Sequence, residues 1–121
     1  MSDRDIALQF NDAINARDLD SLVALMTDDH RFVDTAGATF EGAARASEIW
    51  AGFFAAFPDY RNHVETVIEK AGTVAIAGRS TCSDPRLAGP ALWSAIIVDG
   101  VVREWRVHED TPDNRARLGL E

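Results

Sequence analysis

The sequence predicts a single α+β domain in which N-terminal helices pack on one curved, mainly antiparallel sheet. In the first half of the chain, apolar residues recur mainly at helical spacing. In the second half, they form strand-like runs separated by turn residues. Helices that precede a series of consecutive strands are typical of an α+β domain with an antiparallel meander.

Three helices are expected before the first long strand. The first begins at Ser2, which is followed three residues later by a carboxylate, as in a capping box. The second is short and is capped by Asp18, and residues 27–29 are expected to end it. The third covers about 42–57 and stops before Pro58, because the residue preceding a proline disfavours helix.

Five strands and a final helical turn are also expected, and the first strand lies between the second and third helices. The strands are placed at about 30–34, 60–70, 73–83, 91–99 and 101–110. Asp99-Gly100 predicts a tight hairpin between the last two strands. Thr111-Pro112 begins the helical turn, with proline at its favoured first position.

Composition limits the partners and cofactors. The chain carries 20 acidic and 12 basic residues, a formal net charge of −8, which disfavours nucleic acid and anionic membranes as partners. Cys82 is the only cysteine, and no two histidines have metal-ligand spacing, so we expect no disulfide, no metal and no other cofactor. No signal sequence is recognisable, and no apolar run approaches the ~18 residues of a membrane span. A cytoplasmic location is therefore expected.

Two expected strands, 74–77 and 91–98, are apolar at both parities, which means that they carry apolar residues at odd as well as at even positions. A sheet with one solvated face should alternate apolar and polar residues. The few expected helices can cover only one face, so the outer face is expected to meet a second copy of the chain. The sequence thus predicts a homodimer through the outer sheet face.

Three segments carry a resemblance to a known family. They read NARDLDSLVALMTDDHRFVDTAG, FPDYRNHVETVIEKAGTVA and DGVVREWRVHED. With the expected element order, they resemble the nuclear-transport-factor-2-like superfamily, and within it the SnoaL-like and ketosteroid-isomerase-like proteins. The resemblance covers about 5–110 and identifies 1–121 as one SnoaL-like domain. It implies a cone-shaped fold whose sheet wraps a hydrophobic pocket beneath the helices.

Asp34 is the leading catalytic candidate. A carboxylate at the mouth of an apolar element can be desolvated, which makes it a better proton acceptor. The segment FVDTAG resembles the one that holds the base of ketosteroid isomerases, and this places Asp34 as the base. His30 shares a face with Asp34 by strand alternation and is expected to orient it. The alternatives are an Asx-turn residue for Asp34 and a structural histidine for His30.

The groups that would stabilise an oxyanion are altered. Ketosteroid isomerases use a tyrosine on the first helix and a protonated aspartic acid on a late strand. The resemblance places Phe10 and Ser94 at these positions; Phe10 cannot donate a hydrogen bond, and Ser94 is a weaker donor. We therefore expect Ser94, Arg79 or a tryptophan indole N–H to stabilise the oxyanion. An edge salt bridge is the alternative for Arg79.

The last strand offers further candidates. In SnoaL-like cyclases the acid/base aspartate lies on this strand, where the resemblance places Val107, with Glu109 two residues further on the same face. His108 alternates with Glu104 and Arg106 and is interpreted as part of a charged ladder on the outer face.

An apolar pocket is expected to bind a flat ligand, because the chain has three tryptophans and large aromatic rings offer wide contact areas. Plain core packing is the alternative for each ring. The residues assigned to substrate binding are Phe10, Trp50, Phe53, Phe54, Trp93, Trp105 and Val107.

These observations favour acid/base chemistry on a small hydrophobic carbonyl compound, either isomerisation or aldol-type cyclisation through an enolate. A non-catalytic ligand-binding or dimerisation module of the same fold is the alternative. The third hypothesis is epoxide hydrolysis, since Arg79 resembles the arginine of limonene-epoxide hydrolase-like proteins. Thr81 and Val107, however, stand where those proteins have carboxylates.

Overall fold

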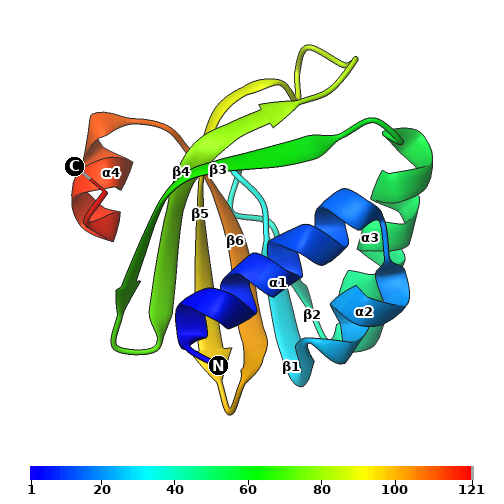
Figure 1. The fold of residues 1–121 in the computed structure, drawn as a ribbon. Helices are drawn as coiled ribbons and strands as arrows, with labels where there is room; N and C mark the ends of the chain where they lie inside the picture. The colour runs from blue at the N-terminus through cyan, green and yellow to red at the C-terminus, as the bar shows by residue number, and fades with distance from the viewer. Residues whose placement is uncertain (121) are drawn as a thin grey trace.

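The computed structural model describes residues 1–120, and these form one curved six-stranded sheet with helices on both faces (Figure 1). The strand order is β2-β1-β6-β5-β4-β3. The helices are α1 (Asp3–Ala16), α2 (Leu19–Ala24), α3 (Ala43–Ala56) and α4 (Pro112–Leu118). The strands are β1 (Met26–Val33), β2 (Thr39–Glu41), β3 (Arg61–Lys70), β4 (Thr73–Thr81), β5 (Gly89–Val98) and β6 (Val101–Glu109).

The predicted α+β class is confirmed, and so is its mainly antiparallel sheet. Only β1 and β6 pair in parallel, whereas the other neighbouring strands are antiparallel. Both expected caps form: the Ser2 hydroxyl accepts the Asp5 N–H at 3.1 Å, and the Asp18 carboxylate accepts the Ser21 N–H at 3.2 Å. The hairpin at Asp99-Gly100 has positive φ at both residues, 52° and 79°.

The start of the sheet differs from the prediction. Residues 27–29 do not end a helix but belong to β1, which begins at Met26. β1 pairs with β6 at Met26 and again from Arg31 onward, and Leu25 O accepts the Val102 N–H at 2.6 Å. The two aspartates, which have poor strand propensity, lie in the irregular part of β1 between these paired positions. β2 was not predicted, because three residues are too few to show an alternating pattern.

The main core lies between the sheet and the first three helices, on the side that we call the inner face. Phe10 from α1 is fully buried there, and its ring centroid lies 4.8 Å from that of Trp105 on β6. Ile76 and Trp93 extend the same core along β4 and β5. Burial of side chains of this size contributes about 1.5–3 kcal/mol each, so these contacts hold α1 against the sheet.

The opposite side, the outer face, is partly covered by the chain's own C-terminal segment. Leu120 and Leu118 pack against Ala75, Ala77 and Leu92, and α4 stands apart from the other helices in Figure 1. This contact explains why β4 and β5 are apolar at both parities, a pattern that the sequence analysis assigned to a second copy. The homodimer stays a prediction for the remainder of this face.

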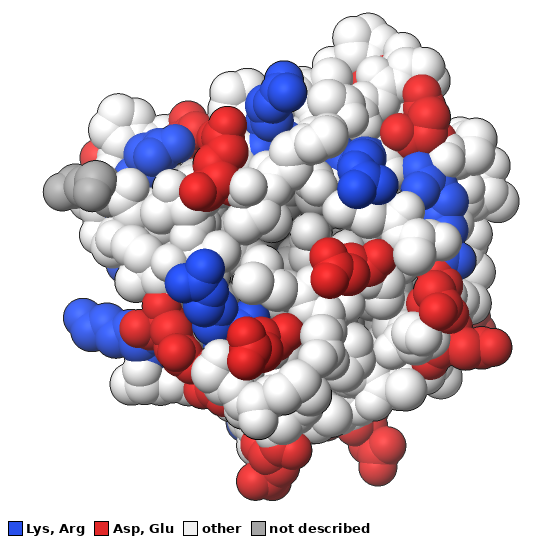
Figure 2. All heavy atoms as spheres, viewed as in Figure 1, with Lys and Arg blue, Asp and Glu red and all other residues white. Residues whose placement is uncertain are grey.

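Charged side chains of both signs are interspersed on the face seen in Figure 2. Within residues 1–120, no three His, Cys, Asp or Glu side chains form a group that could hold a metal ion. In the same part of the chain, no helix combines the length and the apolar character that a bilayer span requires.

Gly78 in β4 allows a close approach between strands. A Cβ atom at this position would lie 2.0 Å from the backbone oxygen of His63, next to the bulge in β3, and 3.3 Å from the Trp93 ring. We therefore expect Gly78→Ala to lower the free energy of unfolding by about 1–3 kcal/mol, the range for overpacked interiors. Urea denaturation measures this change. Gly52→Ala, in α3 with open space around it, is the control and should be neutral or stabilising. Equal effects of the two variants would contradict the packing argument.

Candidate functional site

A cavity of about 530 Å³ opens among α3, the ends of β1 and β6, the start of β5 and the loop that precedes β5. We call it the main cavity. Its volume is within the range of small-molecule sites. Its apolar wall includes Phe32, Phe40, Trp50, Phe53, Trp93 and Trp105. Edge-on ring contacts order this wall, such as Phe32 with Trp50 at 5.2 Å and Trp50 with Phe53 at 5.8 Å.

Asp34 lies in the wall of the main cavity, at the turn that joins β1 to β2. Its Oδ1 accepts the N–H groups of Ala36 at 3.0 Å and Ala38 at 2.9 Å. The Asx-turn, which the sequence analysis gave as the alternative role of Asp34, is therefore present. Oδ2 has no hydrogen-bond partner among residues 1–120, so the carboxylate is held by one oxygen and has the other available to a ligand.

A polar cluster that the sequence analysis missed lies in the same wall, formed by Tyr60, Asn62 and Ser80. The Tyr60 and Ser80 hydroxyl oxygens are 3.0 Å apart, and Ser80 donates to Asn62 Oδ1 at 2.9 Å. The Asn62 amide in turn donates to Asn11 on α1 at 3.1 Å. Burial raises the pKa of Tyr60, which keeps the phenol protonated and able to donate. Ser80 lies on the inner face of β4, but this strand is apolar on both faces, so its sequence does not show which face Ser80 joins.

His108 also lines the main cavity, near the end of β6. Its Nε2 lies 2.8 Å from Ser94 Oγ, so the hydroxyl holds the ring in one orientation. Burial, together with the charge of Arg106, lowers the pKa of His108 and favours the neutral imidazole. The ladder expected from alternation with Arg106 is thus only part of its environment, because the end of β6 also forms the rim of the cavity.

Three of the four predicted catalytic residues lie outside the main cavity. Arg79 is exposed on the outer face of β4, and Ser94 is on the outer face of β5, where it contacts His108. Their expected role as direct oxyanion donors is therefore not supported by their positions. His30 is fully buried, and its Nδ1–H donates to Val102 O at 2.7 Å. No hydrogen bond links His30 to Asp34 among residues 1–120.

Five of the seven residues assigned to substrate binding do line the main cavity, namely Trp50, Phe53, Trp93, Trp105 and Val107. Phe10 and Phe54 do not. Phe10 is core beneath α1, and Phe54 packs on Trp50 at 5.7 Å. The indole N–H groups of Trp50 and Trp105 are buried without a partner among the described residues, and they have almost no exposed surface. They are therefore poorly placed to contact a ligand in the cavity.

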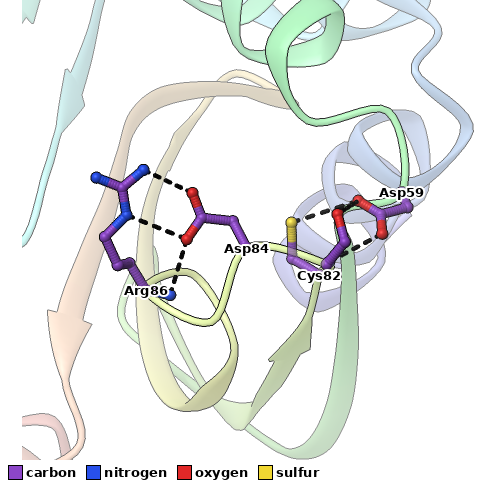
Figure 3. A network of polar contacts seen from close by, with 5 residues as sticks. Asp59, Cys82, Asp84 and Arg86 are labelled. Carbon is purple, nitrogen blue, oxygen red and sulfur yellow. Dashed lines mark hydrogen bonds and ion pairs between the residues drawn. The ribbon is translucent and has the colours of Figure 1, made fainter.

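The loop before β5 forms one side of the cavity through Arg86 and the two residues that follow it. Figure 3 shows how this loop is held. Asp59 accepts the Ser83 N–H at 2.8 Å and the Cys82 thiol at 3.4 Å. Arg86 pairs with Asp84 at 2.6 Å, and this bond lowers the pKa of Asp84 to about 2. The Cys82 thiol thus serves as a weak donor to Asp59, and the Asp59 contacts tie the start of the loop to the segment after α3. The Asp84–Arg86 pair joins two residues of the loop itself.

Comparisons with known proteins agree with this architecture. Residues 7–117 match the family described as "SnoaL-like domain". No curated protein matches the sequence. A candidate polyketide cyclase from Sinorhizobium meliloti superposes with a TM-score of 0.78 at 19% identity, over 86% of this chain and 94% of that one.

Two further solved structures are similar. A candidate ketosteroid isomerase from Kribbella flavida has a TM-score of 0.75 at 20% identity, over 96% of this chain and 86% of that one. An LEH-like epoxide hydrolase from M. tuberculosis has a TM-score of 0.76 at 14% identity, over 88% and 80% respectively. At these identities the likeness shows the fold, and it confirms the nuclear-transport-factor-2-like fold expected from the resemblance.

Burial lowers the pKa of His30, so the folded state resists protonation of this ring. The unfolded chain takes up that proton below pH ~6.5, the usual histidine pKa. Folding stability should therefore fall as the pH drops from about 6.5 toward the lower folded-state value. Urea unfolding at pH 7.5 and 5.5 measures this loss. In His30→Gln, whose amide does not titrate, the loss should be smaller; an unchanged loss would show that other groups cause it.

Proposed function

We propose that this chain, which belongs to the SnoaL-like domain family, is a cofactor-independent acid/base enzyme of the isomerase or polyketide-cyclase type. Its substrate would be a small hydrophobic carbonyl compound bound in the main cavity. The observation that carries this proposal is an apolar cavity of about 530 Å³ whose wall holds both an oriented carboxylate, Asp34, and a protonated phenol, Tyr60. A base and a donor around one apolar site are what enolate chemistry needs.

In the proposed first step, Asp34 Oδ2 accepts a proton from the carbon next to the substrate carbonyl. The electron pair of the broken C–H bond forms the enolate, and negative charge develops on the carbonyl oxygen. The Ala36 and Ala38 N–H groups keep Oδ1 in place, so the carboxylate needs little reorganisation during the transfer.

The developing oxyanion requires a hydrogen-bond donor in the cavity. We assign this role to Tyr60, in place of the direct roles expected for Ser94 and Arg79. A substrate carbonyl would compete with Ser80 for the phenol proton, while Ser80 stays anchored to Asn62. Return of the proton to a different carbon completes an isomerisation. In a cyclisation the enolate carbon attacks a second carbonyl, and the proton held by Asp34 passes to the alkoxide that forms there. His108, neutral at the rim, can carry the proton.

A non-catalytic binding or dimerisation module is the second candidate. It is favoured by the turn at residues 34–38, because the Asp34 carboxylate already has a structural task there. Epoxide hydrolysis, the third hypothesis, is disfavoured: Arg79 is exposed on the outer face, away from the main cavity.

Asp34→Asn separates the two candidates. The amide oxygen can still accept the two N–H groups of the turn, so the fold should persist while the base is lost. Deuterium exchange next to the carbonyl of 2-tetralone, a small apolar ketone, can be followed by proton NMR. We expect the wild type to accelerate exchange and Asp34→Asn to reduce the enzyme-dependent rate by about 10²-fold or more. Tyr60→Phe should also reduce it.

Asp20→Asn, an exposed carboxylate on α2, is the matched control and should leave the rate unchanged. If wild type binds 2-tetralone without accelerating its exchange, the binding-module hypothesis replaces the enzyme. Equal rates for wild type and Asp34→Asn would assign the base to another group.

A further inference from the structure

A second cavity of about 370 Å³ adjoins the main cavity. It lies among the turn at residues 34–37, the end of β6 and α4. Its wall is predominantly polar, whereas that of the main cavity is predominantly apolar. The two cavities share five wall residues, namely Asp34, Thr35, Val107, His108 and Glu109. A ligand at this shared wall could therefore extend into both.

Two arginines, Arg106 and Arg117, line only the second cavity. Neither has a carboxylate within 4.0 Å among residues 1–120, although the chain has a net charge of −8. The only side-chain bond of Arg117 in that part of the chain goes to the neutral Asn114. Four other arginines do have acidic partners, namely Arg31, Arg86, Arg103 and Arg115. Within residues 1–120, the second cavity thus holds two guanidinium groups without an acidic partner, and such groups can bind an anion.

The carboxylates in the same wall do not neutralise these arginines by direct contact. Asp34 is fixed by the backbone of its turn, and Glu109 is exposed at the rim. Both arginines and His108 line the second cavity. Burial, followed by the charges of the two arginines, lowers the pKa of His108. An anionic group placed among them would gain charge-assisted hydrogen bonds, which guanidinium can make in pairs to one carboxylate.

We propose that the second cavity binds the carboxylate of a substrate whose apolar ring system occupies the main cavity. The inference rests on the proposed function and names its substrate class: hydrophobic carbonyl compounds that also carry a carboxylate. Arg106 and Arg117 would hold the carboxylate, and the reacting carbon would lie at the shared wall beside Asp34. The acid group of the substrate would thereby set which of its carbons faces the base.

Two matched probes test this assignment: 2-naphthoate, which carries the carboxylate, and the neutral 2-naphthamide of nearly equal shape. Calorimetric titration of the wild type at low salt should give a Kd for 2-naphthoate about 10-fold below that for 2-naphthamide, in line with the net strength of charge-assisted bonds. The preference should fall as salt is added, because both arginines are exposed.

The double variant Arg106→Gln/Arg117→Gln should lose this preference while its affinity for 2-naphthamide stays unchanged. Arg103→Gln is the control: Arg103 lies on the same strand, is exposed, and pairs instead with Asp29 at 3.5 Å. It should keep the preference. Equal affinities in wild type, binding of neither probe, or a preference that survives in the double variant would each overturn the proposal.

Asp34→Asn distinguishes a failure of this inference from a failure of the proposed function. If the wild type fails to accelerate exchange of 2-tetralone but both wild type and Asp34→Asn prefer 2-naphthoate, the anion site stands and the enzyme proposal fails. If exchange depends on Asp34 but no preference for the carboxylate is found, the enzyme proposal stands and the anion site is wrong.

Discussion

The site depends on the parallel pairing of β1 with β6. This pairing sets Phe32 opposite Trp105 and brings the turn after Val33 to the end of β6, where His108 lies. The ladder is irregular between Met26 and Arg31, and there the buried His30 ring supplies a bond to Val102 O at 2.7 Å. On the outer face, Arg31 pairs with Glu104 at 3.1 Å across the same two strands. Loss of this register would separate Asp34 from both cavities.

Features that depend on residues close together in the sequence were predicted correctly. The positions of side chains that depend on contacts between distant segments were not. The caps at Ser2 and Asp18 and the Asx-turn at Asp34 are local, and all three form. Arg79 and Ser94 were assigned to the cavity, but strand parity places both on the outer face. A strand that is apolar at both parities gives no sign of which face its polar residues join.

The polar cluster could not be found from sequence for a related reason. Tyr60 and Asn62 are twenty and eighteen residues from Ser80, and only the antiparallel pairing of β3 with β4 sets Asn62 opposite Ser80. The proposed oxyanion donor also comes from a different part of the chain than the resemblance implied. Phe10 packs in the core against Trp105, so α1 contributes no hydroxyl to the cavity, and the phenol comes instead from Tyr60, just before β3. The site therefore combines the local turn that holds Asp34 with the polar cluster of Tyr60, Asn62 and Ser80, in which Ser80 is distant in the sequence from the other two.

The central claim is that a substrate oxygen binds at Tyr60 while the neighbouring carbon faces Asp34. A crystal structure of the complex with 2-naphthol, whose planar ring and phenolic oxygen imitate an enolate, tests this claim most directly. The account predicts that the ring lies in the main cavity, with its oxygen within hydrogen-bond distance of the Tyr60 hydroxyl and the adjacent ring carbon next to Asp34 Oδ2. A ring bound outside this cavity, or an oxygen that points to solvent away from Tyr60, would contradict it.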